Sequence, residues 1–223
     1  ANMVATIENR TLAGKSFHKL PSAQGATENC VAHNGMIIPV PGRDLMVQAW
    51  YQGGVSIMDF TDPARPVEIA FFDRGPIDAG RLYVGGSWSA YWLNGRIYSS
   101  EIARGLDVLR LVPSEHLSAA EIAAAEAVSS ETINPQTQTR ITWADTPDVA
   151  TAYLDQLTRA NGVEAELAGQ ARAGIDQWRR GGRVDRRGSA TLAGLLSEAS
   201  GKATGLNKTR LKSLAEMFER RGR

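Results

Sequence analysis

The chain has 223 residues, of which 43% are hydrophobic and 22% charged, and its formal net charge is +1. This balance is that of an ordinary soluble globular protein. No apolar run approaches the ~20 residues that span a bilayer, and the single cysteine, Cys30, excludes an internal disulfide.

The first residues resemble a strand and not a targeting segment. Residues 1–20 hold no basic-then-apolar pattern of a signal peptide, and the chain opens on alanine. We therefore expect a processed product or a fragment whose targeting information lies upstream.

Residues 1–112 predict antiparallel β-structure. Short runs of Val, Ile, Phe, Tyr and Trp are separated by Gly, Pro, Asn and Asp at intervals of about 8–12 residues. The predicted strands are 3–8, 15–20, 29–33, 36–40, 44–51, 54–61, 67–73, 87–93, 96–102 and 105–112.

Two Asn-Gly pairs predict tight hairpins within this region. They lie at residues 34–35 and 94–95. Asn-Gly is the preferred pair of a type I′ turn, because both central residues need a positive φ. The sequence therefore predicts that the strands flanking each pair are antiparallel neighbours.

An internal repeat links two segments that each begin with a glycine. Residues 51–60 and 102–111 share a pattern in which a glycine precedes a run of mostly apolar residues, and Gly54 and Gly105 are 51 positions apart. A period near 50 residues with three or four short strands per unit is typical of a β-propeller blade.

A turn segment with two prolines, Pro63 and Pro66, follows the first of these two segments. Asp62-Pro63 predicts a turn, since proline fixes φ and Asp can accept a hydrogen bond from the backbone ahead. Pro66 lacks an N–H and suits only the start of an edge strand. The sequence thus predicts that residues 54–60 form an inner strand and residues 67–73 the outermost one.

The pattern becomes helical after residue 113. Ser114 is the expected N-cap of an alanine-rich helix ending near Val128, and Thr146-Pro147 is a good start for another helix. Four further helices are expected at 147–160, 164–180, 188–200 and 207–221.

We divide the chain into propeller blades (1–113), a helix and linker (114–146) and a basic helical appendage (147–223). The fold class expected is mainly β with an α appendage, a partial propeller of about two blades with leading strands. Residues 1–150 carry a net charge of −5 and residues 151–223 a net charge of +6.

The first repeat has a specific family resemblance. Residues 54–70, "GVSIMDFTDPARPVEIA", resemble the LVIVD-repeat pattern, and residues 28–54 and 85–111 look like the final blades of bacterial exported LVIVD-repeat proteins. The second copy departs from the pattern, since it lacks the Asp-Pro turn and the outer strand. The resemblance covers roughly residues 15–128 and implies a β-propeller, a periplasmic or extracellular location and a largely uncharacterised function.

A closed propeller needs about four to eight blades, and the sequence offers one full blade, one truncated blade and two leading strands. We expect an absent N-terminal part or a partner chain to supply the missing strand and blades. Without them the segment would expose blade faces and strand edges.

His33 is the candidate metal ligand or base, and a hydrogen-bonded structural histidine is the alternative. Strand alternation would place Cys30 and His33 on opposite faces, which argues against joint chelation. Cys30 is more simply a small buried hydrophobe. A more distant likeness to selenium-binding proteins of the methanethiol-oxidase type implies histidine-bound copper, but no ligand motif of theirs is matched here.

The aromatic residues are dense around the two repeats and have two interpretations. In the first, they line a channel mouth and bind an apolar or sugar-like ligand or partner. In the second, they fill space between blades. Glu101 and Arg104 flank the turn before Gly105, where they form an ion pair or cap the loop. The aromatic candidates are Trp50, Tyr51, Trp88, Tyr91 and Trp92.

The function we expect is that of a non-enzymatic, exported binding or scaffold protein that engages a protein partner. One alternative is a copper-type metal-dependent oxidoreductase, and another is an accessory subunit of a membrane-associated assembly. The basic C-terminal helices lack interleaved aromatic residues, so they predict no specific nucleic-acid site, whereas an anionic membrane surface stays open. No phosphate loop, serine-nucleophile elbow or metalloprotease helix is present.

Overall fold

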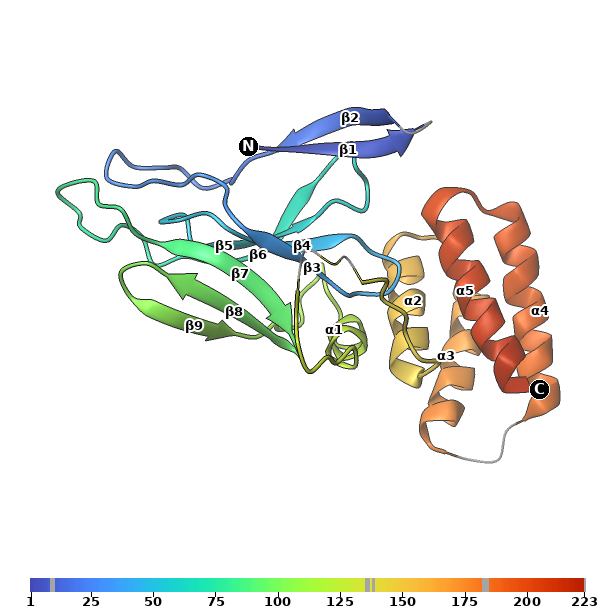
Figure 1. The fold of residues 1–223 in the computed structure, drawn as a ribbon. Coiled ribbons are helices and arrows are strands. Elements are labelled where there is room, and N and C mark those ends of the chain that lie inside the picture. The colour runs from blue at the N-terminus through green and yellow to red at the C-terminus, as the bar shows by residue number, and fades with distance from the viewer. Residues whose placement is uncertain (9–10, 135–136, 138, 182–184, 223) are drawn as a thin grey trace. The chain divides into compact units, whose positions relative to one another are not determined.

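A computed structural model describes residues 1–8, 11–134, 137, 139–181 and 185–222 (Figure 1). The chain forms two compact units. The sheet unit comprises Ala1–Val112 and Ala125–Ile141, and the helical unit comprises Pro113–Ala124 and Thr142–Arg223.

The described residues of the sheet unit form three small antiparallel sheets, with no helical crossover between strands. The sheet orders are β1-β2, β3-β4-β5-β6 and β7-β8-β9. The strands are β1 (Asn2–Glu8), β2 (Thr11–His18), β3 (Gly35–Ile38), β4 (Leu45–Ala49), β5 (Val55–Asp59), β6 (Val67–Phe72), β7 (Ser87–Leu93), β8 (Arg96–Glu101) and β9 (Gly105–Leu109).

The four-stranded sheet confirms the predicted turn after the first repeat. The Asp62 carboxylate accepts a hydrogen bond from the Ala64 N–H at 3.0 Å, and the Asp62 carbonyl accepts one from the Arg65 N–H at 3.0 Å. The chain then re-enters the sheet just after Pro66. As predicted, β5 lies inside the sheet and β6 forms its edge.

The three-stranded sheet confirms one of the two predicted hairpins. Asn94 has a φ of 48° and Gly95 a φ of 80°, and the two residues join β7 to β8. A type I′ turn requires such positive values at both central residues. Gly105 opens β9, and no further described strand pairs with β9. The sheet that contains residues 105–109 therefore has three strands, whereas the sheet that contains residues 55–59 has four.

The predicted strand at 29–33 and its hairpin at 34–35 are wrong. Residues 29–34 form no strand, and β3 pairs with β4 instead. Gly35 serves close packing and not a turn, because a Cβ there would lie 2.4 Å from the Val47 carbonyl oxygen. The second leading strand is also displaced, since β2 begins at Thr11 and ends at His18.

The three sheets are stacked, with the β1-β2 hairpin and the three-stranded sheet on opposite sides of the four-stranded sheet (Figure 1). The Ser16 hydroxyl of the hairpin donates to the Pro63 carbonyl at 2.7 Å, and the Asn2 and Gln48 amides are hydrogen-bonded. On the other side β7 packs against β3 and β4. The apolar side chains fully buried in these strands are Ile38, Leu45, Val47, Ala49 and Ala90.

His18 makes the stability of the sheet unit depend on pH. Its ring is buried beside Trp50, with ring centroids 6.2 Å apart. Burial lowers the pKa of His18 below its usual value of 6.5, against an opposing effect of the Glu68 carboxylate. The unfolded chain therefore binds the proton more readily, so stability present above pH 6.5 is lost as the pH falls below it.

We expect the urea midpoint of the sheet unit to fall between pH 7.5 and pH 5 more steeply in the native chain than in His18→Gln. His116→Gln is the control, because the His116 side chain is 48% exposed and its removal should leave the slope unchanged. Identical slopes for the native chain and His18→Gln would refute this prediction.

The described part of the helical unit contains five helices, counting α1, which runs across the boundary between the units. Thr146 caps α2 as predicted, since its hydroxyl accepts a hydrogen bond from the Val149 N–H at 3.2 Å, and Pro147 occupies the first turn. No described helix is long and apolar enough to cross a membrane. The helices are α1 (Ala119–Glu126), α2 (Pro147–Arg159), α3 (Ala165–Arg179), α4 (Arg186–Lys202) and α5 (Gly205–Gly222).

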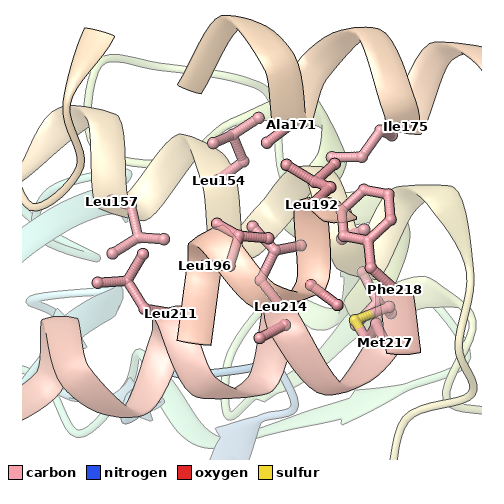
Figure 2. Packing of buried hydrophobic residues seen from close by; sticks show 14 of the residues in the cluster. Leu154, Leu157, Ala171, Ile175, Leu192, Leu196, Leu211, Leu214, Met217 and Phe218 are labelled. Carbon is pink, nitrogen blue, oxygen red and sulfur yellow. The ribbon is translucent and has the colours of Figure 1, made fainter. Parts of the chain in front are cut away.

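The core of the helical unit is aliphatic, with one phenylalanine (Figure 2). Side chains of α2 to α5 converge there because each helix carries apolar residues three and four positions apart. The side chains labelled in this core are Leu154, Leu157, Ala171, Ile175, Leu192, Leu196, Leu211, Leu214, Met217 and Phe218.

The cap of α1 is Ser118 and not Ser114. The Ser118 N–H donates to Glu121 Oε2 at 2.7 Å, and the Glu121 N–H donates to the Ser118 hydroxyl at 3.2 Å. These two reciprocal hydrogen bonds form a capping box. The Ser114 hydroxyl instead accepts from the His116 N–H at 3.2 Å. The fully buried Glu121 carboxylate also accepts two hydrogen bonds from Arg159 Nη2, at 2.8 and 2.9 Å.

Candidate binding site at the junction of two sheets

The structure separates the predicted aromatic residues into core and surface groups. Trp50 and Trp92 are only 2% and 3% exposed and fill the interior of the sheet unit. Tyr91 is half-buried on β7. Tyr51 is half-buried and Trp88 is 46% exposed. Only the last two of these five therefore present substantial aromatic surface next to each other.

A two-way backbone bridge joins the sheets where Tyr51 and Ser87 meet. The Ser87 N–H donates to the Tyr51 carbonyl at 2.7 Å, and the Tyr51 N–H donates to the Ser87 carbonyl at 3.0 Å. Tyr51 has a φ of 51°, which is uncommon for a bulky residue. Such a conformation costs of order 1 kcal/mol or more and is found often at functional positions.

Gly86 permits this approach. Its φ is 93°, and a Cβ there would lie 1.9 Å from the Tyr51 carbonyl carbon and 2.1 Å from the Gln52 nitrogen. Any larger residue would have to displace backbone. The glycine at 86 thus fixes the junction between the four-stranded and three-stranded sheets.

His33, Tyr51 and Trp88 form a cluster, here called the aromatic cluster. The His33 ring centroid lies 5.0 Å from that of Tyr51 and 4.3 Å from that of Trp88, and the Tyr51 and Trp88 centroids are 5.7 Å apart. His33 Nδ1 donates to the Trp88 carbonyl at 2.5 Å, which orients the imidazole. An exposed Trp side chain beside a half-buried Tyr side chain suits contact with a partner or a flat apolar ligand.

The groups around His33 in the structure are a backbone carbonyl and aromatic rings, whereas the sequence offered it as a metal ligand. Its Nδ1 is occupied by the Trp88 carbonyl. Within the described residues, no three His, Cys, Asp or Glu side chains gather closely enough to hold a metal ion. The structure therefore brings His33 together with aromatic rings, and metal binding by it stays a prediction.

The surroundings of Cys30 predict a thiol of low reactivity. Burial, followed by the charges of Glu28 and Asp73, raises its pKa from 9.0 to about 11. At pH 8 the thiolate fraction should be about 100-fold lower than that of an unshifted thiol. We expect iodoacetamide to alkylate Cys30 slowly at pH 8 and at an ordinary rate once urea has unfolded the chain. Equal rates in the two conditions would contradict the burial of the thiol.

Glu101 and Arg104 do not pair with each other in the described contacts. The buried Glu101 carboxylate accepts a hydrogen bond from the Gly86 N–H at 2.5 Å, and Arg104 Nη2 donates to the Pro76 carbonyl at 3.2 Å. Of the two predicted roles, the structure shows loop anchoring. Glu101, at the end of β8, thereby fixes the position of Gly86. Gly86 precedes Ser87, so this hydrogen bond also supports the Tyr51–Ser87 bridge.

Three interactions at the junction, made by Gln52 and Arg74, were not predicted from the sequence. Gln52 donates to the Tyr83 carbonyl at 2.5 Å and accepts from the Ile77 N–H at 3.1 Å, which fastens the loop between β6 and β7. Arg74, just after β6, forms an ion pair with Asp107 on β9. Their partners lie 25 or more positions away, and no local pattern marks them.

The chain matches no family model, no curated protein and no solved structure.

Proposed function

We propose that this chain is a non-enzymatic scaffold whose sheet unit is a sector of a β-propeller and engages a protein partner through its outer faces. Two antiparallel sheets of successive strands, each with a strand opened by a glycine of positive φ, support the blade interpretation. An exported location follows from the family resemblance alone and is part of the proposal.

The observation on which the proposal rests is the apolar surface at both ends of the stack. The hairpin carries Met3, Ile7, Leu12 and Phe17, which are 58%, 79%, 69% and 70% exposed. Met3 pairs with Phe17, and Ile7 pairs with Leu12. Contiguous exposed apolar side chains of this size mark interaction surfaces in soluble proteins.

The three-stranded sheet presents the second apolar surface on β9. Leu106 is 64% exposed and Val108 is 54% exposed. The two residues are two positions apart on one strand and therefore point to the same face of it. In a propeller the next blade covers such a face. A partner sheet packed on the hairpin and on β9 would bury both surfaces.

Within the described part of the chain no strand pairs with the outer edge of β9, and this edge supports a strand-shaped partner. At the equivalent position of the first repeat, a Cβ on Gly54 would lie 2.1 Å from the Phe72 carbonyl oxygen of β6. A Cβ on Gly105 would meet nothing within 4 Å. The space that β6 fills in the first repeat is therefore open in the second, and an antiparallel strand added to β9 would fit it.

Sedimentation velocity tests the proposal with a matched pair of variants. We expect the native chain at about 100 μM to self-associate and to bind the dye ANS, because its apolar faces lack their partner. Leu106→Thr/Val108→Thr should reduce both effects. Val31→Thr is the control, since Val31 is 60% exposed but lies outside the strands. A native chain that stays monomeric and binds no dye would contradict the proposal.

A further inference from the structure

A cleft in the helical unit lies between α3 and α4. Its volume is about 490 Å³, within the range of about 300–1,000 Å³ typical of small-molecule sites. Ala173 and Gly174 line it from α3, Leu192 and Leu195 from α4, and Phe218 from α5. These residues form an apolar part of the lining, and Gln170, Gln177, Ser189 and Thr191 add polar side chains to it.

Gly174 gives the cleft its depth. A Cβ at this position would lie 3.0 Å from Leu192 Cδ2 and 3.0 Å from Phe218 Cε1, so α3 touches the core there through backbone alone. Leu192 and Phe218 belong to the packed core shown in Figure 2. The floor of the cleft is therefore part of the packed core, and a preformed surface lowers the cost of binding a ligand.

Two guanidinium groups line the same cleft. Arg187 lies in the first turn of α4, and Arg221 in the last turn of α5, with its guanidinium carbon 4.9 Å from the centre of the Trp178 ring. Neither pairs with a carboxylate among the described residues. The nearby Asp185 carboxylate is engaged as the cap of α4, where it accepts from the Gly188 N–H at 2.9 Å.

Other arginines of the same helices do have acidic partners. Arg179 on α3 pairs with Asp148 at 2.7 Å, and Arg220 on α5 pairs with Asp145 at 2.5 Å. The cleft therefore combines a partly apolar lining with two arginines that form no described salt bridge, next to the one carboxylate in the lining, that of Asp185.

We infer that this cleft binds a small amphipathic carboxylate, with its apolar body against Ala173, Leu192 and Leu195 and its carboxylate at Arg187 and Arg221. Guanidinium groups bind carboxylates through charge-assisted hydrogen bonds, and the apolar part of the lining favours a ligand with an apolar body over a fully polar anion. The inference is independent of the scaffold function proposed for the sheet unit.

Dodecanoate, below its micelle concentration, is the probe for the full chain. We expect saturable ¹⁵N–¹H shifts at Ala173, Leu195 and the Trp178 indole, and no comparable shifts with dodecyltrimethylammonium. Arg187→Gln should weaken dodecanoate binding by about tenfold or more, because it removes a charge-assisted hydrogen bond.

Two further variants complete the test. Arg186→Gln changes the net charge by the same amount as Arg187→Gln, but Arg186 does not line the cleft. This variant should therefore bind dodecanoate with native affinity. Ala173→Phe fills the cleft from an exposed helix position and should abolish the shifts while the circular dichroism spectrum stays native. If Ala173→Phe unfolds, the two arginine variants decide the question.

Equal weakening by Arg187→Gln and Arg186→Gln would overturn the inference. Equally strong binding of the cationic probe, or no saturable shift at the cleft up to about 1 mM dodecanoate, would overturn it too.

Discussion

Gly86→Ala is expected to destabilise the sheet unit by about 3 kcal/mol or more. Two effects act together. The φ of 93° disfavours any residue with a Cβ, and the added methyl would lie 1.9 Å from the Tyr51 carbonyl carbon. Backbone on both sides of the junction would have to move, and the Tyr51–Ser87 bridge would break.

Gly105→Ala separates these two effects. Its φ of 96° is nearly the same, but a Cβ there meets nothing within 4 Å. Gly105→Ala should therefore lower the free energy of unfolding by only about 1–2 kcal/mol, the cost of a Cβ at a positive φ. Urea unfolding followed by tryptophan fluorescence measures both variants. Equal losses would show that the sheets do not approach each other at Gly86 as closely as described.

Arg159→Ala is expected to destabilise the helical unit by about 3 kcal/mol or more. The Glu121 carboxylate is fully buried, and Arg159 supplies two of its hydrogen bonds, at 2.8 and 2.9 Å. Without the guanidinium the buried carboxylate would lose both of these hydrogen bonds and the positive charge of Arg159. The first turn of α1 should then open, because the same carboxylate also caps the Ser118 N–H.

Arg172→Ala is the matched control for Arg159→Ala. Arg172 bonds to Asp155 at 2.8 Å, but its side chain is 48% exposed. Such pairs contribute about 0–1 kcal/mol. Chemical unfolding followed by far-ultraviolet circular dichroism at pH 7 should therefore show a large loss for the first variant and a small loss for the second. Similar losses would contradict the burial of Glu121.

The sequence predicted elements whose determinants are local. The Asn94-Gly95 turn, the Asp62 turn and the Thr146 cap each depend on residues within four positions of one another, and each was found as predicted. The apolar spacing that predicts four helices after residue 146 is also local, and the four lie within about two residues of their expected bounds.

Two local predictions failed, one because a neighbouring strand changed the role of a glycine and one because a second serine was the better cap. Asn34-Gly35 has the composition of a hairpin turn, yet Gly35 serves the close approach of β4, whose Val47 carbonyl leaves no room for a side chain. Ser114 and Ser118 are both acceptable caps, and the choice of Ser118 follows from Glu121, three residues later.

The candidate site could be predicted only as a set of residues and not as an arrangement. His33, Tyr51 and Trp88 come from three separate segments, and the bridge at Gly86 brings them together. Trp50 and Trp92 belong to the same aromatic-rich stretches but point into the core. Composition does not distinguish the two groups, because burial depends on which face of each strand meets the neighbouring sheet.

Hydrogen–deuterium exchange of the chain in its native assembly, compared with the purified chain alone, tests the scaffold function most directly. The account predicts that the assembly protects the amides of Gly105–Leu109 and slows exchange in the β1-β2 hairpin. Equal exchange of β9 and the hairpin in both samples would contradict it.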